Sequence, residues 1–128
     1  MQTIELDGIG EVKLQATMLT LVIYEQSFEG GDIIADVFGK HKAEDEGDEY
    51  VVNFTTDNWL AISRALWAMC ETEWQLRNDR GDATPNERPK PYRQWVRSIG
   101  QVNMSQISAA VVSEMWDGFF HSGAAASE

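Results

Sequence analysis

The residue types that could do chemistry are few in this chain of 128 residues, and they are poorly grouped. The two histidines, His41 and His121, have no carboxylate or nucleophile at the spacing of a known catalytic motif. The single cysteine, Cys70, falls among apolar residues, where a thiol is usually buried and unreactive. A disulfide or a metal-binding cysteine pair would need a second cysteine. We therefore expect no catalytic residue, no metal ligand and no cofactor, and we predict that the protein is not an enzyme.

Two stretches resemble ligand-binding loops but have the wrong spacing. Gly8 and Gly10 lack the third glycine and the following helix of a nucleotide-binding loop, so they predict a tight turn. In the acidic stretch 44–49, the twelfth position counted from Glu44 or Asp45 is a threonine, whereas a calcium-binding EF-hand has a glutamate there. We expect an acidic loop without a metal. No two other carboxylates occupy the apolar surroundings that would separate their pKa values for acid–base catalysis.

The chain is strongly acidic, and its charge is uneven. The net charge of −11 argues against nucleic-acid binding through phosphate neutralisation. Six of the ten basic residues lie between positions 77 and 97 beside three acids, whereas the rest of the chain carries 18 acids and four bases. This distribution fits a solvated acidic surface, or one that meets a basic partner or the basic segment of a neighbouring copy.

The longest predicted element is a helix over residues 57–78, capped by Thr56 or Asp57. Its apolar residues form a wide arc at helical spacing, which the other elements must cover. Its opposite side suits water or contact with small residues. The arc comprises Trp59, Leu60, Ile62, Leu66, Trp67, Met69, Cys70 and Trp74, and the opposite side comprises Ala61, Ala68, Thr72 and Gln75.

Shorter elements flank this helix. Alternating apolar and polar residues predict a β-hairpin over 2–15. Two short helices follow over 17–39, with Thr17 and Asp32 as caps. The second helix has no basic residue before Lys40, so a DNA-reading helix-turn-helix is rejected. An acidic loop is predicted over 40–56, with a short strand at Tyr50–Phe54.

After the central helix, all three prolines fall in the segment 79–91, which predicts a surface crossover. Two further helices over 91–120 begin at Pro91 and Asn103. The fold class is therefore mainly α (α+β), an N-terminal β-hairpin followed by about five helices packed around the tryptophan-rich helix 57–78. We expect one globular domain over 1–121 and a disordered tail over 122–128.

The start of the chain lacks the basic residues and apolar core of a secretory signal. No apolar run approaches the roughly 20 residues that cross a bilayer. These features predict a cytoplasmic protein without a membrane partner.

Three pieces of sequence, in this order, resemble one known family. They are a helix, double glycine and second helix (TLVIYEQSFEGGDIIADVFGK), a long helix after an acidic loop (DNWLAISRALWAMCETEW), and the segment PYRQWVRSIG before a last amphipathic helix. Together with the leading hairpin, they resemble the tail assembly chaperones of long-tailed bacteriophages and prophages of Gram-positive hosts. The resemblance covers roughly residues 2–120 and involves no catalytic residue.

This resemblance implies a non-enzymatic protein of the bacterial host cytoplasm that is absent from the mature virion. Its client would be the tape-measure protein, which it would keep soluble until tail-tube protein polymerises around it. A longer form made by ribosomal frameshifting would recruit the tube subunits, and many copies per client imply weak self-association. Candidate client contacts are the aromatic residues on the short or terminal helices, for which core packing is the alternative: Trp95, Trp116, Phe119 and Phe120.

Two other functions remain open from the residues. The chain could be another phage structural protein, such as a connector or a tail-tube subunit, although a tube subunit should be mostly β. It could also be an acidic DNA mimic that inhibits a DNA-binding protein. That function would need carboxylates at regular spacing along one face, whereas many of them cluster in one loop.

Overall fold

The computed structural model describes residues 1–38 and 56–120, with side chains from residue 59 onward in the second range. Some sequence-based expectations lie outside the described residues. They are those for His41, the acidic loop with its rejected calcium site, the strand at 50–54, His121 and the tail 122–128.

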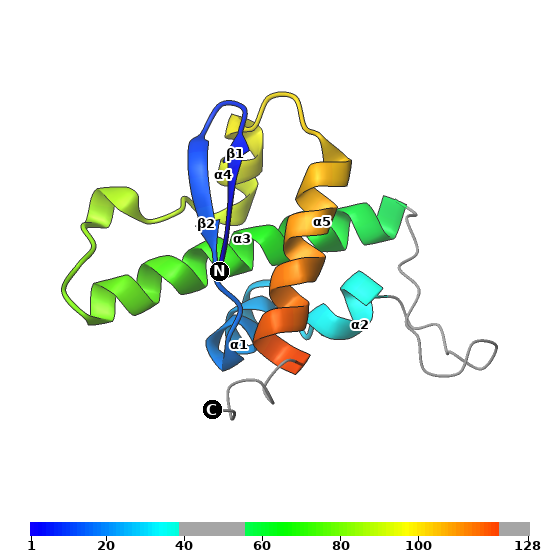
Figure 1. Cartoon of the computed structure of the whole chain (residues 1–128), viewed down its shortest axis with the longest axis horizontal. Coiled ribbons are helices and arrows are strands. Elements are labelled where there is room, and N and C mark those ends of the chain that lie inside the picture. Colours follow the sequence, from blue (N-terminus) through cyan, green and yellow to red (C-terminus); the bar gives the residue numbers. More distant parts are fainter. Residues whose placement is uncertain (39–55, 121–128) are drawn as a thin grey trace.

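The order of the elements confirms the predicted fold class. Among the described residues, a two-stranded antiparallel sheet is followed by five α-helices, so the protein is mainly α in an α+β arrangement (Figure 1). A 3₁₀ turn, η1, precedes α4, and a π-helical turn, η2, extends α5. The elements are β1 (Gln2–Leu6), β2 (Gly10–Leu14), α1 (Met18–Ser27), α2 (Ile33–Phe38), α3 (Thr56–Asp79), η1 (Pro85–Glu87), α4 (Tyr92–Ser98), α5 (Met104–Met115) and η2 (Trp116–Phe120).

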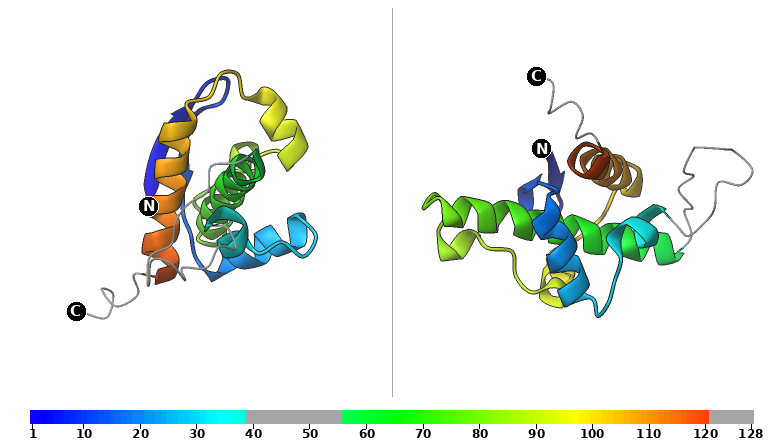
Figure 2. Two further views of the ribbon diagram at one scale, coloured as in Figure 1. Left: turned by 90° about the vertical axis from the view of Figure 1, so that its right-hand side faces the viewer. Right: turned by 90° about the horizontal axis from the view of Figure 1, so that it is seen from below.

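The long helix α3 lies at the centre of the fold, as predicted. Strand β2 and the helices α1, α2 and α5 all contact it. The left view of Figure 2 looks nearly along α3, with the hairpin and α5 on one side of it and α1 and α2 below. Because the helix is surrounded, residues over most of its circumference are buried.

The side of α3 opposite the apolar arc packs against small residues. Ala61, Ala68 and Thr72 are buried there, and the Thr72 hydroxyl lies 2.7 Å from that of Thr20 in α1. Leu60 is the exception to the predicted arc, because its side chain is 46% exposed. Contact with small residues, rather than water, therefore explains this side of the helix.

The hairpin and its tight turn form where the sequence predicted them. Ile4 pairs with Val12, and the side chains of Ile4, Leu6 and Leu14 are buried while their neighbours in the strands face outward. Gly8 has φ +92°, and a Cβ there would lie 2.1 Å from the Ser98 carbonyl oxygen. The Gly8–Gly10 pair is thus a turn packed against the end of α4.

Capping side chains precede α1, α2 and α5 at the residues predicted from the sequence. The Thr17 hydroxyl accepts from the Leu19 N–H at 3.1 Å, and the Asp32 carboxylate accepts from the Ile34 N–H at 3.1 Å. The Asn103 side chain accepts from the Gln106 N–H at 3.1 Å and begins α5. Residues 80–91 connect α3 to α4, and Pro91 is the N-cap of α4, one position before the helix rather than in its first turn.

Candidate functional site

Two buried carboxylates on α3 were not predicted from the sequence. Glu71 is only 3% exposed and Glu73 is also buried. Each meets an arginine. Arg88 Nε and Nη2 donate to Glu71 Oε2 at 2.9 and 2.6 Å, and Arg77 Nε donates to Glu73 Oε2 at 2.7 Å. These ion pairs compensate charges that water cannot reach.

The same arginines hold the segment 82–91, which we call the strap, against α3. Arg77 Nη1 donates to Glu87 in the strap at 2.6 Å, and the Arg88 guanidinium lies 5.0 Å from the centroid of the Trp74 ring. Two indole groups of α3 also donate to strap carbonyls. Trp67 Nε1 donates to Lys90 O at 2.8 Å, and Trp74 Nε1 donates to Thr84 O at 2.9 Å. Polar contacts with α3 therefore fix the strap.

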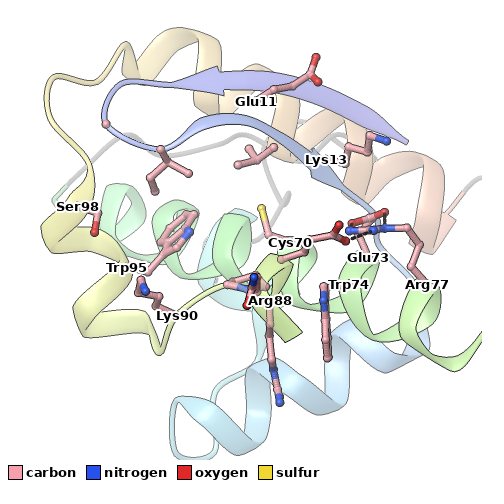
Figure 3. A pocket seen from close by; sticks show the side chains of 16 residues that line it. Glu11, Lys13, Cys70, Glu73, Trp74, Arg77, Arg88, Lys90, Trp95 and Ser98 are labelled. Carbon is pink, nitrogen blue, oxygen red and sulfur yellow. Dashed lines mark hydrogen bonds and ion pairs between the residues drawn. The ribbon is translucent and has the colours of Figure 1, made fainter. Parts of the chain in front are cut away.

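The strap, β2, α3 and α4 line an open pocket of about 600 Å³ (Figure 3). This volume lies within the range of about 300–1,000 Å³ that is typical of ligand pockets. Its lining combines apolar side chains with charged ones at the rim. The lining includes Ile9, Glu11, Val12, Lys13, Cys70, Glu73, Trp74, Arg77, Glu87, Arg88, Lys90 and Trp95.

Two of the cations that line the pocket, Arg77 and Arg88, already form ion pairs within the chain. Hydrogen bonding to Glu71 raises the pKa of Arg88, and hydrogen bonding to Glu73 and then Glu87 raises the pKa of Arg77. The same contact with Arg77 holds the pKa of Glu87 below its usual value. Both guanidinium groups are thus already paired within the chain.

Cys70 faces the pocket without the properties of a nucleophile. Burial raises the pKa of its thiol, and the nearby Glu73 and Glu71 raise it further. The thiolate is therefore strongly disfavoured at neutral pH. This geometry agrees with the prediction that Cys70 is buried on the apolar arc of α3.

A second surface lies at the end of α5, where three of the four predicted contact residues come together. Trp116 is 49% exposed, Phe120 is 39% exposed and Phe119 is half-buried. The Trp116 and Phe120 ring centroids are 4.9 Å apart, and Phe120 also meets the Phe38 ring of α2 at 6.2 Å. We call Trp116, Phe119 and Phe120 the aromatic cluster.

Trp95, the fourth predicted residue, does not belong to that surface. It lies on α4, is only 4% exposed and lines the pocket. Figure 1 shows α4 at the opposite end of the molecule from the end of α5. All four residues were proposed as client contacts with core packing as the alternative, and Trp95 takes a buried place whereas Trp116 and Phe120 are exposed.

Some features of the site were readable from the sequence and others were not. Glu73 and Arg77 stand four residues apart on a predicted helix, which is the spacing of a helical ion pair. Glu71 and Arg88 are 17 residues apart across the crossover, and no local pattern joins them. Only the packing of the strap reveals that pair.

Comparisons of the chain with protein-family models, with curated proteins and with solved structures gave no match. Among the described residues, no group of three or more histidine, cysteine or acidic side chains is placed to hold a metal ion. In the same part of the chain, no helix combines the length and apolar character needed to cross a membrane.

Proposed function

We propose that this chain is a non-enzymatic tail assembly chaperone of a bacteriophage or prophage. It binds the tape-measure protein, keeps that long helical client soluble in the host cytoplasm, and helps tail-tube protein polymerise around it. The proposal takes its client from the family resemblance of the sequence. The observation that carries it is the exposed aromatic cluster on an otherwise acidic molecule.

The cluster has the form of a prearranged apolar anchor. The turn η2 packs closely on the start of α1, since a Cβ on Gly118 would lie 2.3 Å from the Ala16 carbonyl oxygen. Phe38 supports the Phe120 ring from α2. Held in this way, Trp116 and Phe120 can meet the apolar stripe of a helical client with little loss of conformational entropy.

The net charge of the molecule supports its proposed role of keeping the client soluble. A client coated with copies of net charge −11 would repel other coated clients, which keeps the complexes dispersed. Apolar anchors surrounded by polar surface also restrict contact to the client's exposed stripes.

Co-expression with the tape-measure protein from the source genome tests the proposal. We expect the client to be insoluble alone and soluble with this chain, in many copies per client. The double variant Trp116→Ala/Phe120→Ala should lose most of this effect. Val102→Ala is the matched control because Val102 is similarly exposed, at 49%, but precedes α5 at its other end. A client whose solubility is indifferent to the wild-type chain would overturn the proposal.

The described residues weaken the tail-tube alternative. A tail-tube subunit should be mostly β, whereas the sheet in this part of the chain has two strands beside five helices. A connector would be distinguished by the co-expression experiment, because it has no solubilising effect on the tape-measure protein.

A further inference from the structure

The pocket is lined by a tryptophan, Trp95, whose indole N–H has no acceptor among the described residues. The indole N–H groups of Trp67 and Trp74 donate to carbonyl oxygens of the strap. Trp95 is equally buried, yet in the described part of the chain its Nε1 donates to no group. An indole N–H that opens onto the pocket and has no acceptor in the described protein can donate to a ligand oxygen there.

Two cations line the same pocket. Figure 3 draws Lys90 toward the same end of the pocket as Trp95, with Lys13 at the other end. Both lysines are exposed, and neither forms an ion pair within the described residues. Figure 3 also shows the Glu11 carboxylate pointing away from the pocket. An N–H donor and an ammonium group that line one pocket favour an anionic oxygen over a neutral one.

The middle of the pocket is suited to an apolar group. Ile9 and Val12 of the hairpin line it opposite Cys70 and Trp74 of α3. The volume of about 600 Å³ exceeds what a lone carboxylate would fill. The ligand must therefore carry an apolar body next to its anionic group.

We propose that this pocket binds a carboxylate joined to an apolar body. The carboxylate accepts from Trp95 Nε1 and pairs with Lys90, and the apolar body lies between β2 and α3. A free arylalkyl acid and the acidic side chain of a protein segment with a neighbouring aromatic residue share this chemistry. The site is separate from the aromatic cluster, so it does not depend on the proposed chaperone function.

Nuclear magnetic resonance of the indole N–H groups tests the site directly. The Trp95 signal is assigned by its loss in Trp95→Phe, and the full chain is titrated with 3-phenylpropionate and with the neutral 3-phenylpropanamide. We expect the acid to shift the Trp95 signal and to bind about fivefold or more tightly than the amide, because hydrogen bonds to charged groups are stronger. No shift with any probe, or equal binding of acid and amide, would overturn the proposal.

Variants separate the donor from the cation. Trp95→Phe keeps an aromatic ring and breaks no hydrogen bond within the described residues, so it should fold and bind the acid about tenfold more weakly. Lys90→Gln should weaken binding about two- to fivefold. Trp116→Phe and Arg97→Gln are matched controls outside the pocket and should bind as the wild type does. If Trp95→Phe fails to fold, the comparison of acid with amide and the Lys90→Gln variant still decide the question.

A blocked helical peptide with glutamate and phenylalanine four residues apart distinguishes the two sources of the ligand. Tighter binding of the peptide than of 3-phenylpropionate identifies a protein segment as the ligand. Tighter binding of the free acid identifies a small molecule. Either result supports the pocket as a carboxylate site, whereas unchanged affinity in both Trp95→Phe and Lys90→Gln contradicts it.

Discussion

The side chains of Glu71 and Arg88 form an asymmetric pair. The Glu71 side chain is 3% exposed and that of Arg88 is 53% exposed, so water can solvate the arginine but not the carboxylate. Glu71 Oε2 also accepts from Gln75 at 2.7 Å, while its Oε1 has no hydrogen-bond partner. The consequence of removing one partner should therefore depend on which one is removed.

We predict that Arg88→Met lowers the free energy of unfolding by about 3 kcal/mol, because it leaves a buried carboxylate without its cation. Glu71→Gln should cost only about 1 kcal/mol, since the freed arginine becomes hydrated. Urea denaturation measures both values. Arg93→Ala is the control, because Arg93 is exposed and forms no ion pair among the described residues. A larger loss for Glu71→Gln than for Arg88→Met would contradict this account.

The turn η2 is the element that presents the aromatic cluster. It continues α5 with a wider, π-helical turn and has no buried residue of its own. Its position depends on close approach to Ala16, which a glycine at position 118 permits. The geometry of the cluster is therefore a property of this contact and not of the aromatic residues alone.

Gly118→Ala should displace η2 while it keeps every aromatic side chain. The new methyl group would lie 2.7 Å from the Ala16 Cβ as well as close to the Ala16 carbonyl. We expect a loss of about 1–3 kcal/mol in stability and weaker client binding. Thermal unfolding and co-purification measure the two effects, and Ala109→Gly, on an exposed face of α5, is a control for binding. Unchanged stability and binding would show that η2 does not need this contact.

The strap is the element most dependent on polar contacts, and its stability should depend on pH. Arg77 holds the pKa of Glu87 below its usual 4.5 in the folded state. Near that pH the unfolded chain binds more protons, so this contribution is present above about pH 4.5 and is lost as the pH falls through the lowered pKa.

We predict that Glu87→Gln is less stable than the wild type at neutral pH and that the difference disappears in acid. Once Glu87 is protonated, both chains carry a neutral group at this position. Urea denaturation across this range of pH measures the difference. A difference that stays constant as the pH falls would show that the Arg77–Glu87 contact does not contribute through its charge.

For the whole molecule, folding divides the basic segment 77–97 into two parts. Arg77 and Arg88 are paired with acids of their own chain. Arg93 and Arg97 are exposed, stand four residues apart on α4, and form no ion pair in the described part of the chain. We call Arg93 and Arg97 the basic face of α4. Because each copy has a net charge of −11, the acidic surface of a second copy can pair with this face.

Self-association through this face should be weak and sensitive to salt. We expect oligomers seen by sedimentation velocity to dissociate between about 0.01 M and 1 M salt, where the Debye length falls from about 30 Å to about 3 Å. Arg93→Gln/Arg97→Gln should remove the salt-sensitive part. Arg80→Gln is the control, because Arg80 already faces Asp82 at 3.6 Å. Oligomers insensitive to both salt and these substitutions would contradict the prediction.

The sequence by itself determined the elements of this protein. The hairpin, the caps Thr17, Asp32 and Asn103, and the central helix were all predicted, because each depends on residues within one or two turns of one another. The burial of Cys70 could also be predicted from its place on the apolar arc of the central helix.

Only the tertiary structure decided the sites. Glu71 meets Arg88 because the strap folds back on α3, and Trp95 separates from the aromatic cluster because α4 and the end of α5 lie apart. Leu60, on the predicted apolar arc, is exposed. These outcomes depend on contacts between residues distant in the chain, whose pairing no local pattern of residue types specifies.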